Sequence, residues 1–187
     1  IAPSRYNSYL SMLNGDEEED TFRQDIYKKD WYVMRALIQR VSKASVNILG
    51  NRHSAIKNGL LVFACWENDD DFSDSDWMLH KVLNLRVFDD EKNVMNQSVQ
   101  DIKGEILIVS QFTLYASTKK GNRPSYIRSA KADISKPFYD DFVKKALNVS
   151  GLNVKSGIFG ADMKIQLIND GPVTIFMDSK NKEWKKI

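Results

Sequence analysis

Two short segments contain residue types that could do chemistry with little help from titratable side chains. The first is residues 169–174, Asn-Asp-Gly-Pro-Val-Thr, near the end of the 187-residue chain. Proline has no backbone N–H and glycine tolerates unusual backbone angles, so Gly171-Pro172 can offer bare carbonyls to a ligand. An X-Pro bond also becomes cis at a cost of only about 0.5 to 1 kcal/mol. The alternative is an ordinary turn, rich in glycine and proline, between strands at 163–168 and 173–178.

The second segment is Ser110-Gln111-Phe112-Thr113, where an apolar run beginning at Glu105 turns polar. It can present hydroxyls, an amide and backbone N–H groups at one place. Donors arranged in this way stabilise a developing oxyanion by roughly 3 to 4 kcal/mol each in known hydrolases. The alternative is a strand that simply reaches solvent.

Other catalytic arrangements are poorly supported. The two histidines, His53 and His80, lie far in sequence from Ser110 and Thr113, so a Ser-His-Asp triad would need a chance meeting in space. The chain has no His-x-x-x-His pair, no phosphate-binding glycine loop with its lysine and no dinucleotide fingerprint. We therefore expect neither a metal site nor a cofactor. Cys65 falls within an apolar run and is interpreted as a core residue.

Composition indicates one globular domain, with 42% hydrophobic and 28% charged residues. A single cysteine excludes an intrachain disulfide and fits a reducing compartment, and no apolar stretch approaches the roughly 20 residues that span a bilayer. We expect a cytoplasmic protein. Residues 34–187 hold 23 basic and 18 acidic side chains, a balance that suits a polyanionic partner.

The chain divides into three parts. Residues 1–33 include the acidic run 16–20 and lack a regular apolar period, which predicts a flexible acidic extension. They resemble neither a transit peptide nor a secretory signal. The patterned domain covers residues 34–179, and residues 180–187 form a basic tail.

The patterned domain alternates strands and helices. Strands are predicted at 35–41, 44–48, 59–66 and from 105, and a continuous apolar run such as 59–66 is typical of a strand covered on both faces. One helix follows a cap at Ser73 or Asp74. A second begins at Ser135, with Pro137 in its first turn, and ends at Gly151. This order predicts a single α/β domain in which two main helices pack on one face of a mixed sheet. The residues expected on the buried faces are Trp77, Met78, Val82 and Leu85 in the first helix and Phe138, Phe142, Ala146 and Leu147 in the second.

Five ordered motifs together resemble the D-aminoacyl-tRNA deacylases. They lie at residues 34–41, 110–114, 120–125, 160–163 and 169–174, and the similarity extends over about residues 34–178. The Ser-Gln-Phe-Thr and Gly-Pro-Val-Thr motifs are the most specific. The resemblance implies the three-layer α/β fold of that family. It also implies a homodimeric enzyme that hydrolyses the ester bond between a D-amino acid and the terminal adenosine of tRNA, with glycyl-tRNA as a further substrate.

The resemblance assigns the Gly-Pro segment to chiral selection. In such proteins this peptide is cis and enters the active site of the partner subunit, where its carbonyls meet the amino group of the substrate. Gly171 and Pro172, with Asn169 of the same motif, would then exclude L side chains. Arg40 matches an arginine that braces this loop through hydrogen bonds. The alternative for Arg40 is a surface-facing strand residue.

The resemblance leaves the catalytic group open. Thr113 could be the nucleophile, but a hydroxyl without an evident base is weak. In the other interpretation the 2′-hydroxyl of tRNA and a water act, Phe112 and Thr113 contribute backbone N–H groups to the oxyanion, and Ser110 and Gln111 shape the pocket.

Contacts with tRNA are expected at two places. Phe159 and Met163 match positions near the adenine pocket of the family, where an aromatic ring can stack on a base, although core packing is an equal alternative. Lys119, Lys120 and Arg123 could contact phosphates or form a solvated basic loop.

Two rival functions remain open from the sequence. One is a related proofreading enzyme with a trans Gly-Pro bond that acts on L-aminoacyl or mischarged tRNA; the intact Ser-Gln-Phe-Thr argues against it. The other is a non-catalytic tRNA-binding module, which would bind uncharged tRNA and release no amino acid.

Overall fold

The structure is a computed structural model in which residues 34–179 are described. The predicted extension at 1–33 and tail at 180–187 lie outside these residues. Across 34–179, no helix is both long and apolar enough to cross a membrane. In chain order the elements are β1 (Arg35–Ile48), β2 (Asn51–Ile56), β3 (Gly59–Cys65), α2 (Phe72–Asn84), β4 (Phe88–Asp89), β5 (Met95–Gln97), β6 (Glu105–Ser110), the 3₁₀ helix η1 (Phe112–Tyr115), α3 (Ala132–Ser150), β7 (Val154–Ser156) and β8 (Met163–Asp178).

Strand β1 organises the six-stranded sheet. Its first half pairs antiparallel with β3 and its second half with β2, while β8 runs antiparallel along its other edge over both halves. Strands β3, β6 and β7 are mutually parallel. The sheet is therefore mixed, as the sequence predicted. The two strands expected at 35–41 and 44–48 are one continuous strand that changes partner midway.

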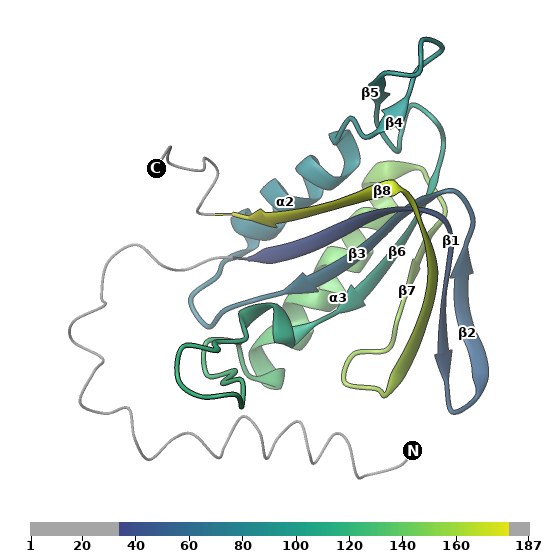
Figure 1. The fold of residues 1–187 in the computed structure, drawn as a ribbon. Helices are drawn as coiled ribbons and strands as arrows, with labels where there is room; N and C mark the ends of the chain where they lie inside the picture. The colour runs from purple at the N-terminus through teal and green to yellow at the C-terminus, as the bar shows by residue number, and fades with distance from the viewer. Residues whose placement is uncertain (1–33, 180–187) are drawn as a thin grey trace.

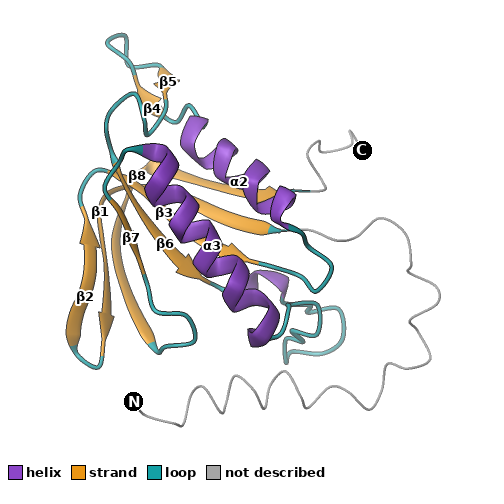
Figure 2. Cartoon of the chain, turned by 180° about the vertical axis from the view of Figure 1, so that it is seen from behind, coloured by secondary structure: helices purple, strands orange, loops and turns teal. Residues whose placement is uncertain are grey.

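The sheet is curled (Figure 1). Apolar side chains are buried on both of its faces. Helices α2 and α3 cover one face together (Figure 2). Alternate residues of β3 point to opposite sides: Leu60 and Val62 belong to the core under the helices, and Leu61 belongs to a second core with Val46 and Leu167. This two-sided burial explains the continuous apolar run. The predicted single α/β domain, with two helices packed on a mixed sheet, is confirmed. The structure adds that the sheet is nearly closed and barrel-like.

Helix α2 begins two residues earlier than a cap at Ser73 predicts. Its N-cap is Asp71, whose carboxylate accepts hydrogen bonds from the backbone N–H of Ser73 (2.7 Å) and Asp74 (3.2 Å). The Asp74 carboxylate accepts one in return from the Asp71 N–H (3.3 Å). Because one carboxylate serves two otherwise unpaired N–H groups, Asp71 is the better cap.

Helix α3 also starts early, at Ala132, so Pro137 lies inside it and not in its first turn. The Ser135 hydroxyl donates to the carbonyls of Ala130 (2.8 Å) and Lys131 (2.7 Å), which ties the first turn down before the proline. The end at Gly151, in the left-handed conformation, was predicted correctly. Leu147 was predicted to face the core, but it is 49% exposed; Tyr139 occupies the buried face.

Candidate active site

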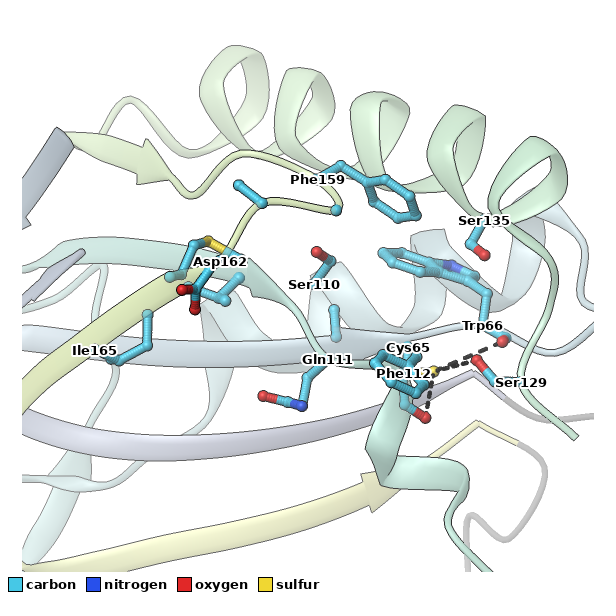
Figure 3. Close-up of a pocket in the computed structure, with 15 residues that line it drawn as sticks. Cys65, Trp66, Ser110, Gln111, Phe112, Ser129, Ser135, Phe159, Asp162 and Ile165 are labelled. Atoms are coloured by element: carbon cyan, nitrogen blue, oxygen red, sulfur yellow. Dashed lines mark hydrogen bonds between the residues drawn. The ribbon is translucent and has the colours of Figure 1, made fainter. Parts of the chain in front are cut away.

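A pocket of about 260 Å³ lies where β3 and β6 end and the segment before β8 crosses them (Figure 3). Three stretches line most of it: residues 64–66, 109–112 and 159–163. Ser129, Ser135 and Ile165 complete the wall. A largely apolar cleft with a few hydroxyl and backbone groups is the usual form of a small-molecule site.

The predicted polar break at Ser110 is the point where β6 becomes η1. The Gln111 N–H donates to the carbonyl of Ala64 (2.9 Å), which holds the end of β6 against β3. The Ser110 hydroxyl points toward the segment carrying Phe159, whereas the Gln111 amide points away from it (Figure 3). Ser110, Gln111 and Phe112 line the pocket. Thr113 lies one residue beyond them, and its hydroxyl accepts a hydrogen bond from Gln111 Nε2 (2.5 Å).

The opposite wall is the segment that carries Phe159 and Met163. It is fastened to β6 because the Gly157 N–H donates to the Ile108 carbonyl (2.9 Å) and the Tyr139 hydroxyl contacts the carbonyls of both residues (3.1 Å each). The Tyr139 and Phe159 ring centroids are 5.7 Å apart. A Cβ at Gly157 would lie 2.5 Å from the Met163 sulfur, so glycine lets that side chain pass. Burial raises the pKa of Tyr139, so its hydroxyl remains a donor at neutral pH.

Cys65 also borders the pocket but is poorly suited to be a nucleophile. Its side chain is buried, with Sγ 3.4 Å from the Ser129 hydroxyl. Burial raises the pKa of the Cys65 thiol to about 12, so at neutral pH the reactive thiolate is scarce. The prediction of a core cysteine is confirmed.

The Gly-Pro segment is a bulge within one long strand, and the prediction of a turn between two strands is wrong. Both halves of β8 pair with β1, with Thr174 opposite Gln39 and Asn169 opposite Val41, so residues 170–173 bulge out opposite Arg40 alone. Because the two halves of β8 share one partner strand, the chain continues in the same direction through the bulge. Figure 1 shows β8 bending midway along its length. The Gly171-Pro172 peptide bond is cis, as the resemblance implied.

Asn169 and Gly171 fix the shape of the bulge. The Asn169 side chain accepts from the Val173 N–H (2.9 Å) and donates to the Val173 carbonyl (3.1 Å), closing its base. Gly171 has a φ of +121°, and a Cβ there would lie 2.8 Å from Val173 Cγ2 and 2.9 Å from Arg40 Nη2. Larger residues are therefore excluded by both conformation and space. Gly171 and Pro172 themselves are exposed.

Arg40 lies under the bulge and is not surface-facing, because only 8% of the residue is exposed. Its Nε donates to the Asp170 carbonyl (3.0 Å) and its Nη1 to the Val87 carbonyl (2.6 Å). The Asp170 and Asp89 carboxylates lie 3.4 and 3.6 Å from the guanidinium. The guanidinium thus joins the bulge to the start of β4, and buried charge of this kind is sustained only by such partners.

The bulge lies away from the pocket of its own chain. Arg40 holds it beside Val87, at the start of β4, through the hydrogen bond from Nη1 to the Val87 carbonyl (2.6 Å). None of residues 169–174 lines the pocket. The bulge therefore does not enter the pocket of its own chain.

The structure thus gathers the predicted residues into three groups. Ser110, Gln111, Phe112, Phe159 and Met163 share the pocket, with Thr113 adjacent. Arg40, Asn169, Gly171 and Pro172 form the bulge and its support. Lys119, Lys120 and Arg123 are exposed on the loop between η1 and α3.

Sequence reasoning missed several pocket residues and one support. Trp66, Ser129 and Ser135 line the pocket from elements distant in sequence, and no local pattern marks them. The Val87 carbonyl that holds Arg40 is a backbone group, which the sequence cannot distinguish from any other. The glycines flanking Phe159, at positions 157 and 160, were a usable signal that this segment approaches β6 closely.

The chain matches known proteins over the whole described domain. The family described as D-Tyr-tRNA(Tyr) deacylase matches residues 37–178. D-Aminoacyl-tRNA deacylases of Flavobacterium johnsoniae and of Bacteroides fragilis strain YCH46 are each 56% identical over 150 residues, covering 80% of this chain and 100% of each relative.

Two solved structures share the fold. One, described as c-Myc DNA unwinding element binding protein, is 39% identical with a TM-score of 0.71 and covers 76% of this chain and 97% of that one. The other, a probable eukaryotic D-amino acid tRNA deacylase, is 17% identical with a TM-score of 0.69, covers 78% and 99%, and supports the fold alone. The family match and the identity of the relatives, over a domain that places both specific motifs at defined sites, show that the chain belongs to the D-aminoacyl-tRNA deacylase family.

Proposed function

We propose that two copies of the chain build each active site, with the pocket of one copy receiving the Gly171-Pro172 bulge of the other. The activity is that of an ester hydrolase acting on D-aminoacyl-tRNA. The observation that carries the proposal is that none of residues 169–174 lines the pocket of its own chain, while Arg40 holds the bulge beside Val87. The exposed position of Gly171 and Pro172 on a braced bulge is what an element inserted into a partner requires.

In this arrangement the bulge acts as the chiral filter. The carbonyls of Gly171 and Pro172 bind the amino group of the substrate, and the surrounding main chain leaves no space for an L side chain. Arg40 and Asn169 hold the bulge in position through the hydrogen bonds described above. Main chain reads the geometry at the α-carbon, so the filter serves D-amino acids of many sizes and lets glycine pass.

Catalysis in this proposal does not depend on one side chain. Neither of the two histidines in the chain lines the pocket, and the Thr113 hydroxyl accepts a hydrogen bond from the Gln111 amide, a donor that cannot take its proton. We assign oxyanion stabilisation to the backbone N–H groups of Phe112 and Thr113, at the start of η1. The 2′-hydroxyl of the terminal adenosine and a water supply the remaining chemistry. Ser110 and Gln111 shape the pocket.

The tRNA-binding residues follow from the same arrangement. Phe159 and Met163 form the wall against which the terminal adenine packs, since both line the pocket. Lys119, Lys120 and Arg123 are exposed on one loop and suit contacts with phosphates, which makes binding salt-dependent. We also place the enzyme in the cytoplasm, where a single buried thiol at Cys65 stays reduced.

Mixing two inactive variants tests the shared site. Ala161→Trp fills the pocket and Gly171→Ala distorts the bulge. In a mixed dimer one site combines the intact pocket of one copy with the intact bulge of the other. Random subunit exchange should therefore restore about a quarter of wild-type deacylation, because half of the dimers are mixed and each has one intact site.

Deacylation of D-tyrosyl-tRNA after partial unfolding and refolding of the mixture measures this recovery. Each variant refolded alone is the control, and light scattering reports the oligomeric state. Activity that stays at the level of the separate variants in a mixture shown to contain mixed dimers would reject the shared site. A monomeric wild-type protein would do the same.

Replacing Thr113 separates the two catalytic interpretations. Thr113→Val keeps the side-chain volume and the backbone N–H, so kcat should fall by no more than about tenfold if no side-chain nucleophile acts. A nucleophilic threonine would lose several orders of magnitude. Single-turnover deacylation of D-tyrosyl-tRNA decides between them, and a circular dichroism spectrum confirms that the variant is folded.

A further inference from the structure

A second cavity begins on the far side of Phe159 from the active-site pocket. This groove, of about 470 Å³, lies between the exposed side of α3 and the residues facing it, His53 of β2 and residues 156–159. We call it the α3 groove. Phe159 lines both the groove and the pocket, and Ser135, which lines the pocket, is followed in α3 by Lys136, which lines the groove. The two cavities are therefore neighbours separated by one aromatic side chain.

The α3 groove is elongated and runs along helix α3. The residues that line it recur at helical spacing along α3, from Lys136 through Asp140 and Lys144 to Asn148. These twelve steps correspond to roughly 18 Å of helix. An extended ligand that starts in the pocket can follow this groove away from Phe159.

The charge and polarity of the α3 groove suit single-stranded nucleic acid. Lys136 is paired with Asp140 (2.5 Å), but Lys144 forms no ion pair with any residue of 34–179, so the groove keeps positive charge. Leu147 and Ile158 are 49% and 46% exposed at its walls. Basic groups that follow the backbone are a feature by which proteins hold single strands, and exposed apolar side chains beside them offer surface that a base can bury.

We propose that the α3 groove binds the nucleotides that precede the terminal adenosine at the 3′ end of tRNA. Their phosphates contact Lys144 and their bases pack on Leu147 and Ile158, while the adenosine occupies the pocket beyond Phe159. The inference rests on the proposed function, because it requires the adenosine in that pocket. It also gives the exposed Leu147 side chain a binding role.

Substrates of increasing length test the groove directly. D-Tyrosyl-adenosine fills only the pocket, whereas D-tyrosyl-CCA trinucleotide and D-tyrosyl-tRNA extend beyond it. For the wild-type protein, KM should be roughly tenfold lower for the trinucleotide than for the adenosine ester, the order expected from burying part of one aliphatic side chain under a base. Lys144→Ala and Leu147→Glu should abolish this gain and leave cleavage of the adenosine ester unchanged.

The controls are matched residues outside the groove. Lys92→Ala removes an exposed lysine from the β4–β5 turn, and Val149→Glu adds a carboxylate at a 68% exposed position of the same helix. Both should keep the gain with length. For Lys144→Ala, the slope of log KM against log salt on the trinucleotide should also decrease by about 0.7, the value for one lost phosphate contact on a single strand.

The outcomes distinguish the groove from the proposed function. A gain with length that survives both groove substitutions overturns the groove proposal, as does a wild-type protein that shows no gain. Failure of the wild type to cleave any of the three substrates would instead reject the active-site assignment. Loss of the gain in the control variants as well would show a general charge effect and would also overturn the groove.

Discussion

D-Tyrosyl-tRNA should be hydrolysed by the wild-type protein at least about a hundredfold faster than L-tyrosyl-tRNA. In the proposed site the carbonyls of Gly171 and Pro172 hold the amino group, so an L side chain is directed into main chain. Hydrogen bonds from Arg40 and Asn169 hold this main chain in place, so it cannot easily move away from the L side chain. A clash that displaces the reacting ester by about 1 Å costs on the order of a hundredfold in rate, so L substrates that still bind should be unproductive.

A filter made of main chain also predicts that the rate of deacylation depends little on the side chain of the D-amino acid. D-Aspartyl-tRNA should be cleaved at a rate similar to D-tyrosyl-tRNA, and glycyl-tRNA should be cleaved to some extent, because glycine has no side chain to collide. The measurement is deacylation of the four substrates at fixed salt, with protein-free samples to subtract spontaneous hydrolysis. Equal rates for the two enantiomers would contradict the chiral filter, and hydrolysis of none would favour a binding module.

Gly171→Ala should lower kcat/KM on D-tyrosyl-tRNA by roughly a hundredfold while leaving the protein folded, since a displacement of about 1 Å in a positioning element has that effect. A Cβ at this position would lie 2.8 Å from Val173 Cγ2 and 2.9 Å from Arg40 Nη2, and φ is +121°. The backbone of the bulge must shift to relieve these contacts. Because the proposed filter is the main chain of this bulge, its carbonyls move with the backbone.

Gly50→Ala is the matched control. Gly50 also has a positive φ, +80°, but it lies in the turn after β1 and a Cβ there would meet nothing within 4 Å. Both variants therefore carry the backbone strain of alanine at positive φ, a destabilisation of roughly 1 kcal/mol or more visible in thermal melts. Only Gly171→Ala should lose activity. If the two variants lose activity equally, the effect is one of stability and the bulge has no special role.

The sequence by itself determined the family, the fold class and the two specific motifs. The continuous apolar run that became β3 was recognisable because a strand covered on both faces needs apolar residues at every position. The change to polar residues at Ser110 marked the end of β6 for the converse reason. Helix ends were predicted to within a few residues, since Asp71, Ser73 and Asp74 are all competent caps and only geometry selects among them.

Tertiary structure decided how the motifs are used. A glycine-proline pair between two strand-like runs favours a turn, and the pairing of both halves of β8 with one strand, β1, made it a bulge instead. The strand pattern around Arg40 allows a surface-facing side chain, but in the structure this side chain is buried. Its guanidinium donates hydrogen bonds to the carbonyls of Asp170 and Val87. Both acceptors are backbone groups, which no pattern of side chains reveals. The pocket gathers Trp66, Ser129 and Phe159 from segments far apart in sequence. The hydrogen-bond register and the curl of the sheet bring these residues together. Both arise from long-range strand pairing that local composition does not encode.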